Sequence, residues 1–184
     1  MENPESPLTV TVPRLPTPRL VLRAFQSRDY PDYALEMADP EATRFTARPA
    51  ERAVWWSFAA ASGGWVLDGA GWWAVELRET GRAIGLVGVF VRETAPEDFE
   101  IGWAIYRAHW RKGYAVEAAR AALDYAFEGH RASKVIAHID QENVASVAVG
   151  KKIGMTYEKD VDFFDKTIGR YLITRDQRSA AERG

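Results

Sequence analysis

The chain has 184 residues, of which 47% are hydrophobic and 27% charged, and its formal net charge at pH 7 is -2. This length fits one globular domain with its own core and leaves little room for a second. The near-neutral charge gives no support for nucleic-acid binding, which usually needs a basic surface. The absence of cysteine excludes disulfides, thiolate metal ligands and a cysteine nucleophile. The 3 histidines are scattered, so we expect no metal site.

No targeting signal or membrane span is visible in the sequence. Residues 1–18 are rich in Pro and Thr but lack the basic and apolar regions of a signal peptide. No apolar run is long enough to cross a bilayer. We therefore expect a cytoplasmic protein without a membrane partner. We also expect a flexible N-terminal segment over residues 1–16, a single domain over 17–176 and a flexible tail over 177–184.

Strands and helices alternate in the first half of the chain. A β-rich run over residues 19–25 predicts a strand, and a polar cap after it opens a helix over residues 30–37. The apolar, alanine-rich residues 51–67 predict a helix that breaks at a Gly-Gly pair. Residues 72–78 and 83–92 flank a glycine-bearing loop and predict a hairpin. The second of these strands is apolar on both faces, so we expect it in the centre of the sheet.

The second half continues this alternation. Apolar and polar residues alternate over 99–106 and predict a strand, which is followed by a helix that ends at Gly129. Residues 135–139 predict a short buried strand, and a further helix leads to a closing hairpin over 155–164 and 167–174. Hairpin strands followed by βαβ crossovers predict an α/β fold. We expect a central mixed, mostly antiparallel sheet of about seven strands with about four helices on both faces.

The junction between the strand at 99–106 and the next helix has the composition of a phosphate-binding loop. Backbone N–H groups at a helix start lack intrahelical partners, and the helix dipole adds partial positive charge there. Glycine lets the main chain approach a phosphate closely, and basic side chains add formal charge. This junction reads Arg111, Lys112, Gly113, Tyr114 and Ala115. Many strand-turn-helix units contain a glycine and basic residues, so this junction alone does not distinguish a phosphate-binding loop from an ordinary turn.

Four segments in order resemble the GCN5-related N-acetyltransferases and, within that superfamily, the branch of the ribosomal-protein alanine acetyltransferases. The segments are TPRLVLRAF, EIGWAIY, WRKGYAVEAARAALDYAF and NVASVAVGKKIGM. The similarity covers residues 17–176, so it implies the acyl-CoA N-acyltransferase fold for the whole domain. It also implies acetyl-CoA as cosubstrate without a metal, and it is compatible with a homodimer.

The resemblance implies a binding mode for acetyl-CoA. The diphosphate would lie on the amides of residues 111–115. The pantetheine arm would pair with the strand edge at Trp103, Ala104 and Ile105, where this strand splays from the next one. A main-chain N–H of the same strand would stabilise the oxyanion. Asn143 would both cap its helix and contact CoA.

The resemblance also implies a proton donor for the departing CoA thiolate. Many superfamily members carry a tyrosine seven residues after the asparagine that aligns with Asn143, but this chain has Gly150 there. The ribosomal-type branch uses a serine three residues after the asparagine, and Ser146 occupies that place. Ser146 is therefore the predicted general acid, although it could equally be an ordinary residue of a capped helix. The family loop usually begins with Gln or Arg where this chain has Trp110, which we interpret as packing.

The acceptor ammonium must lose a proton before it can attack, so a general base is required. Glu100 is the predicted base, because it lies opposite the apolar face of its strand and the family often places a glutamate there. Partial desolvation would raise its pKa to a useful range. His138 and Asp140 are the alternatives.

The resemblance assigns the acceptor pocket to residues 51–67 and 157–170. Acidic and aromatic side chains in the second segment suit a cationic amine, but they also suit a solvated hairpin. Four tryptophans either line this pocket or belong to the core: Trp55, Trp56, Trp72 and Trp73. We predict an N-acetyltransferase that transfers acetyl from acetyl-CoA to a small-molecule amine or a peptide N-terminus in a ternary complex. The alternative is a non-catalytic acyl-CoA-binding sensor or assembly module on the same fold.

Overall fold

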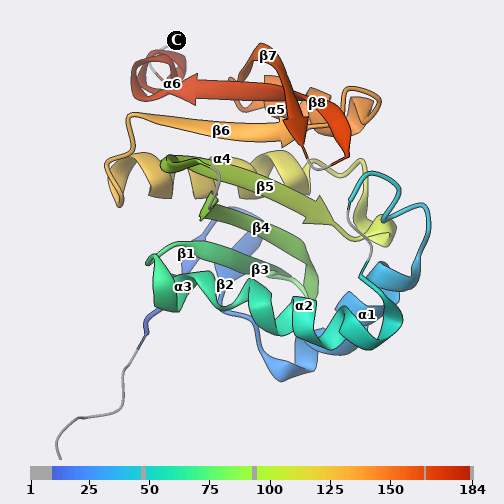
Figure 1. Ribbon diagram of the computed structural model, residues 1–184. Helices are drawn as coiled ribbons and strands as arrows, with labels where there is room; N and C mark the ends of the chain where they lie inside the picture. The colour runs from blue at the N-terminus through green and yellow to red at the C-terminus, as the bar shows by residue number, and fades with distance from the viewer. Residues whose placement is uncertain (1–9, 47–48, 93–94, 164, 183–184) are drawn as a thin grey trace, which may run out of the picture.

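The computed structural model describes residues 10–46, 49–92, 95–163 and 165–182 (Figure 1). Within this part of the chain, one 8-stranded sheet has the order β1-β2-β3-β4-β5-β6-β8-β7. Only the β5–β6 pair is parallel, so the sheet is mixed and mostly antiparallel, as predicted. The strands are β1 (Leu15–Pro16), β2 (Leu20–Arg23), β3 (Gly71–Leu77), β4 (Ala83–Arg92), β5 (Ala95–Ile105), β6 (Lys134–Ile139), β7 (Thr156–Phe163) and β8 (Lys166–Thr174).

The helices follow the predicted order, and the predicted break in the second one is confirmed. α2 ends at Ala61, and α3 begins at Gly64, where a Cβ atom would lie 2.6 Å from the carbonyl oxygen of Ala70. The α-helices are α1 (Tyr30–Ala38), α2 (Val54–Ala61), α3 (Gly64–Leu67), α4 (Tyr114–Glu128), α5 (Val144–Lys152) and α6 (Arg175–Glu182). Short 3₁₀ turns span Ser27–Asp29, Glu51–Ala53 and Arg107–His109.

Different helices cover the two faces of the sheet. α1 and α2 pack on one face, where Tyr33 and Phe58 meet Leu86 and Tyr106. α4 covers the other face through Leu123 and a stripe of buried alanines at helical spacing. β4 is buried over most of its length because both of its faces are covered, as predicted. In Figure 1, α2 lies in front of the sheet and α4 behind it.

Packed structure extends beyond both boundaries expected for the domain. On the N-terminal side, β1 pairs with β2, and Trp73 Nε1 donates a hydrogen bond of 2.8 Å to the carbonyl oxygen of Pro13. On the C-terminal side, the expected tail forms most of α6, and Arg178 Nε donates to Asp124 Oδ1 of α4 at 2.8 Å. Residues 1–9 and 183–184 lie outside the described structure.

The feature that positions the site is a split between β5 and β6. These strands pair only at Phe99 with Val135 and at Glu100 with Ile136, whereas β5 stays paired with β4 to its end. Beyond Glu100, the edge of β5 over residues 101–105 has no strand partner among the described residues. The predicted splay between these two strands is therefore present, and it leaves main-chain groups available for an extended ligand.

Candidate active site

The predicted phosphate-binding loop lies between β5 and α4. Arg111 has φ 58° and Gly113 has φ 80°, so two residues in the left-handed region flank Lys112. Alternating backbone conformations of this kind gather N–H groups around an anion. The predicted helix after the loop is present as α4, which begins at Tyr114, and no side chain in the described structure caps its first amides. The loop therefore offers free amides, a helix dipole and two exposed basic side chains to an anionic ligand.

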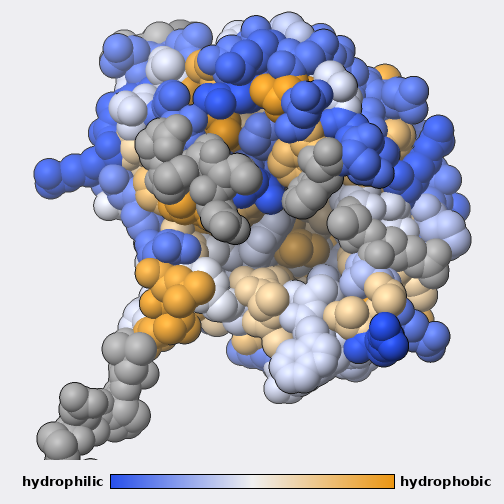
Figure 2. Space-filling model, viewed as in Figure 1, coloured by the Kyte–Doolittle hydropathy of each residue, from blue (hydrophilic) through white to orange (hydrophobic). Residues whose placement is uncertain are grey.

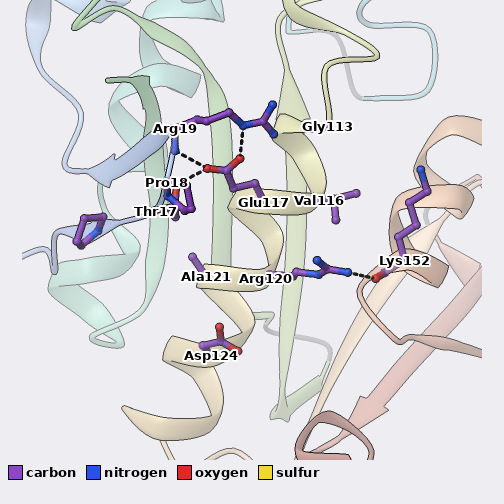
Figure 3. Close-up of a pocket in the computed structure, with 11 residues that line it drawn as sticks. Thr17, Pro18, Arg19, Gly113, Val116, Glu117, Arg120, Ala121, Asp124 and Lys152 are labelled. Carbon is purple, nitrogen blue, oxygen red and sulfur yellow. Dashed lines mark hydrogen bonds and ion pairs between the residues drawn. The ribbon is translucent and has the colours of Figure 1, made fainter. Parts of the chain in front are cut away.

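Arg19, the residue immediately before β2, holds this loop in place. Arg19 Nε and its backbone N–H donate to Glu117 of α4 at 2.7 and 2.8 Å (Figure 3). Arg19 Nη1 also donates to the carbonyl oxygen of Lys112 at 2.9 Å, and the guanidinium lies 4.7 Å from the ring centroid of Tyr114. Thr17 Oγ1 adds a hydrogen bond of 2.6 Å to Glu117. These contacts fix the start of α4 relative to the sheet.

Trp110 ties the loop to the end of β5 but is not buried. Its side chain is 41% exposed, and its Nε1 donates to the carbonyl oxygen of Ile105. The interpretation of Trp110 as packing therefore holds only in part, because its main contact is this hydrogen bond. The bond connects the proposed diphosphate loop with the proposed pantetheine edge.

Asn143 caps α5, as predicted. Its Oδ1 accepts a hydrogen bond of 3.1 Å from the backbone N–H of Ser146. Because the cap uses the backbone of Ser146, the serine hydroxyl takes no part in it. The side chain of Ser146 is half-buried.

The face of α5 that carries Ser146 is turned toward the split. Ser146 and Gly150 are one helical turn apart and share a face. A Cβ atom at Gly150 would lie 3.3 Å from Ile139 Cδ1 on β6 and 3.9 Å from the ring of Trp103 on β5. Position 150 thus looks onto both strands of the split, and a tyrosine there would have to displace Ile139.

Glu100 lies at the apex of the split in a buried ion-pair cluster. Glu100 is only 4% exposed, and its carboxylate accepts hydrogen bonds of 2.6 and 2.8 Å from Nε and Nη2 of Arg92. His138 Nδ1, on β6, lies 3.1 Å from Glu100 Oε2. The Phe163 ring lies 4.9 Å from both the Arg92 guanidinium and the His138 ring centroid. The structure therefore places Glu100, the predicted base, next to His138, one of the two alternatives.

The expectation that the pKa of Glu100 is raised was wrong. Burial alone would raise this pKa, but the hydrogen bonds from Arg92 and the close approach of His138 outweigh it and hold the pKa below its usual range. Glu100 is therefore a firmly ionised carboxylate whose oxygens are already occupied by donors. Such a group binds a proton weakly and suits the orientation of a neighbour better than proton abstraction.

The face of the sheet toward α1 and α2 carries a flat aromatic platform next to this cluster. The indole of Trp72 lies on two glycines, because Cβ atoms at Gly88 and Gly102 would come within 2.7 and 2.5 Å of it. Trp72 stacks on Phe90 with 4.9 Å between ring centroids. Figure 2 shows this side of the molecule hollowed over the middle of the sheet, between α2 and the β7–β8 hairpin.

The other residues considered for the acceptor pocket have mixed positions. Trp73 is fully buried core, whereas Trp55 and Trp56 are 45% and 70% exposed. Phe164 lies outside the described residues. The carboxylates of the β7–β8 hairpin are largely paired: Glu158 with Arg170 at 2.7 Å, Asp160 with Gln141 at 2.7 Å, and Asp162 with Thr167 at 3.3 Å. This pairing reduces the attraction that the hairpin would exert on a cationic amine.

Two functional relationships were not found by sequence reasoning. The first is the ion pair of Arg92 with Glu100, since the sequence placed Arg92 only in a strand. The second is the contact of Arg19 with Glu117, since the sequence placed Arg19 only in a family motif. The contact of Arg92 with Glu100 is diagonal across the β4–β5 hairpin, because Phe90 is the residue that pairs with Glu100, and the local sequence pattern did not predict that register. The second needs the fold itself, since it joins residues 98 positions apart.

Within the described residues, no cluster of His, Cys, Asp or Glu has a metal-binding arrangement. No helix in the same part of the chain is both long and apolar enough to cross a membrane.

Comparison with known proteins places the chain in a family. The model of the acetyltransferase (GNAT) domain matches residues 19–156, so the chain belongs to the GNAT acetyltransferases. The chain is also 34% identical over 165 residues to the uncharacterized protein YkkB of Bacillus subtilis (strain 168), covering 86% of this chain and 94% of YkkB.

Solved structures agree with this assignment. An acetyltransferase from Agrobacterium tumefaciens str. C58 is 29% identical with a TM-score of 0.81, covering 94% of this chain and all of that one (100%). Two more distant structures share the fold alone. Aminoglycoside acetyltransferase AAC(6')-Ib in complex with coenzyme A and kanamycin is 16% identical (TM-score 0.74; coverage 89% and 99%). Ribosomal-protein-S5-alanine acetyltransferase from Vibrio fischeri is 13% identical (TM-score 0.74; coverage 90% and 98%).

Proposed function

We propose that the protein is an acetyl-CoA-dependent N-acetyltransferase that acts on a primary amine by direct attack in a ternary complex. One observation carries this proposal. The unpaired edge of β5 leads directly into a loop with two left-handed residues and an uncapped helix start. An extended pantetheine arm that ends in a diphosphate is complementary to that arrangement.

The proposed chemistry divides between the two sides of the split. CoA would lie on the side of α4 and α5, with Ser146 as donor to the departing thiolate and Asn143 at the start of its helix. A main-chain N–H near Trp103 to Ile105 would stabilise the oxyanion. The amine would approach from the side of Trp72 and Glu100. Without a cysteine in the chain, we derive no acyl-enzyme step.

The class of acceptor is the open part of this proposal. We propose a small-molecule amine or a peptide N-terminus as the acceptor. Among proteins with the same fold, AAC(6')-Ib is named as an aminoglycoside acetyltransferase in complex with kanamycin, and another structure is named as a ribosomal-protein-S5-alanine acetyltransferase. Both neighbours share the fold alone with this chain. Membership of the ribosomal-protein branch, a cytoplasmic location and a homodimer therefore stay predictions.

A non-catalytic acyl-CoA-binding module is the second candidate. It is favoured by Gly150, which cannot donate a proton, and by the pairing of Glu100 with Arg92. A thiol-release assay with acetyl-CoA across simple amines, aminoglycosides and short peptides separates the two functions. The proposal expects CoA release that depends on both enzyme and acceptor. Tight CoA binding without turnover on any acceptor would favour the module.

A further inference from the structure

We propose that His138, oriented by the Arg92-Glu100 ion pair, accepts the proton that the acceptor ammonium must lose. This inference rests on the proposed function and replaces Glu100 with its neighbour as the general base. Glu100 then becomes a positioning residue.

The hydrogen-bonding state of the cluster follows from its contacts. Glu100 is ionised and accepts two hydrogen bonds from Arg92, so toward His138 it can only accept. His138 Nδ1 is buried and lies 3.1 Å from Glu100 Oε2, and it forms no hydrogen bond within the described structure. The nearby carboxylate favours a proton on Nδ1 over one on Nε2, because a small rotation of the imidazole would give Nδ1–H an acceptor. Nε2 then has a free lone pair, and no described residue forms a hydrogen bond with it. A histidine held in this tautomer by a carboxylate is prepared to accept a proton at Nε2.

The position of His138 fits this task. Glu100 pairs with Ile136, and His138 is the next residue of β6 on the same face, at the point where the strands have separated. This face is the one on which Trp72 lies, opposite the face covered by α4. The base therefore lies on the acceptor side of the split, while Ser146 approaches from the CoA side.

The charges around His138 are nearly balanced. β4 contributes Arg92 and β5 contributes Glu100, while Arg170 on β8 lies opposite His138 in the sheet. Three more charged side chains lie further along the same face. Asp98 forms ion pairs of 2.9 Å with both Lys134 and Arg170, and Glu158 forms one of 2.7 Å with Arg170. Asp140, after β6, lies 3.8 Å from Lys166. The carboxylate of Glu100 is the charged group in contact with the imidazole, and it stabilises the imidazolium that forms.

Nε2 of His138 takes one proton from the ammonium, and the freed amine nitrogen forms a bond to the thioester carbon. The carbonyl electrons move to oxygen and return as the C–S bond breaks. The second nitrogen proton passes to the thiolate, with Ser146 as its predicted carrier, and the imidazolium releases its proton to water. The products are the amide, CoA thiol and one proton.

His138→Gln and His130→Gln form a matched pair for the test. His130 is also packed between aromatic rings, at 4.8 Å from Phe99 and 5.1 Å from Tyr125, but it lies after α4, at the end opposite the phosphate-binding loop. We expect His138→Gln to lower kcat/KM for the amine by about 10²-fold or more and to abolish the acidic limb of the pH profile. Affinity for CoA and thermal stability should match those of His130→Gln, which keeps wild-type activity. Glu100→Gln should lower kcat while His138 remains present.

A second measurement does not depend on turnover. Nitrogen NMR of the imidazole should show the proton of neutral His138 on Nδ1, and the addition of acetyl-CoA should perturb His138 but not His130. A proton on Nε2 would overturn the inference. So would His138→Gln with activity within threefold of wild type and an unchanged pH profile. If the wild type turned over no amine, the proposed function would fail together with this inference, whereas an active His138→Gln would remove the inference alone.

Discussion

Arg19 and Glu117 are 98 positions apart in the chain and form a double contact, from the side-chain Nε and from the backbone N–H of Arg19. The pair links the two sequence segments in which a motif was visible, TPRLVLRAF and WRKGYAVEAARAALDYAF. Together with the bond from Arg19 to the carbonyl of Lys112, it fixes the loop proposed to hold the diphosphate. Two segments that resemble a family separately thus form one physical unit.

Arg19→Ala should weaken CoA binding without abolishing the fold. Loss of the tether lets the loop leave its binding conformation, and the apparent Kd rises in proportion to the lost population. We expect a rise of roughly fivefold to tenfold by calorimetry. Arg82→Ala is the control. Arg82 forms an exposed ion pair of 2.8 Å with Asp32 of α1, and its side chain has no hydrogen bond to residues 111–115 in the described structure. Equal Kd values for the two variants would contradict a positioning role of Arg19.

Gly113→Val tests the loop conformation itself. Gly113 and Gly81 both have positive φ, at 80° and 68°, so valine is strained by about 1–3 kcal/mol at either position. Space is not the limit, since a Cβ at Gly113 meets only Arg19 Nη2 at 3.4 Å and one at Gly81 meets nothing within 4 Å. Both variants should unfold at lower temperature, and only Gly113→Val should lose CoA affinity by tenfold or more. Wild-type CoA binding by Gly113→Val would refute the phosphate-binding role.

Ser146 and Asn143 can be separated by experiment, because the cap of α5 uses only the backbone of Ser146. Ser146→Ala should leave the free energy of unfolding unchanged and lower kcat by about 10²-fold if the hydroxyl donates the proton. Asn143→Ala should instead cost about 1 kcal/mol of stability, measured by urea unfolding. An unchanged kcat in Ser146→Ala would contradict the role of Ser146 as general acid, because another group would then have to protonate the thiolate.

The buried pair of Arg92 and Glu100 should give the protein a pH-dependent stability. The folded pKa of Glu100 is depressed, so its contribution is present above the unfolded value, near 4.5, and is lost as the pH falls through the folded value. Urea unfolding should therefore show a steeper loss of stability below pH ~4.5 in the wild type than in Glu100→Gln.

At pH 7, Glu100→Gln should lower the free energy of unfolding by about 1–3 kcal/mol, because it leaves the half-buried Arg92 without its charge partner. Arg92→Met combined with Glu100→Gln should recover part of this loss. If the double variant were no more stable than Glu100→Gln, the ion pair would not account for the cost.

Local signals in the sequence predicted most of the fold and the phosphate-binding loop. The alternation in residues 99–106, the glycine before α4 and the cap at Asn143 each act over a few residues, and all three are present. The hydrophobic run of β4 likewise predicted a central strand.

The remaining features depend on register and packing, which short patterns do not encode. The ionisation of Glu100 was mispredicted because its state is set by Arg92 across a hairpin and by His138 across a parallel pair. Residues 177–184 were expected to form a flexible tail, yet residues 177–182 belong to α6, and Arg178 donates a hydrogen bond to Asp124 of α4.

A crystal structure of the protein with bound CoA tests the central claim most directly. The account predicts the diphosphate on the amides of residues 111–115 and the pantetheine arm along β5 at residues 101–105. The thiol would then lie at the apex of the split, between Ser146 on one side and His138 on the other. CoA bound elsewhere, or a thiol remote from both residues, would contradict the account.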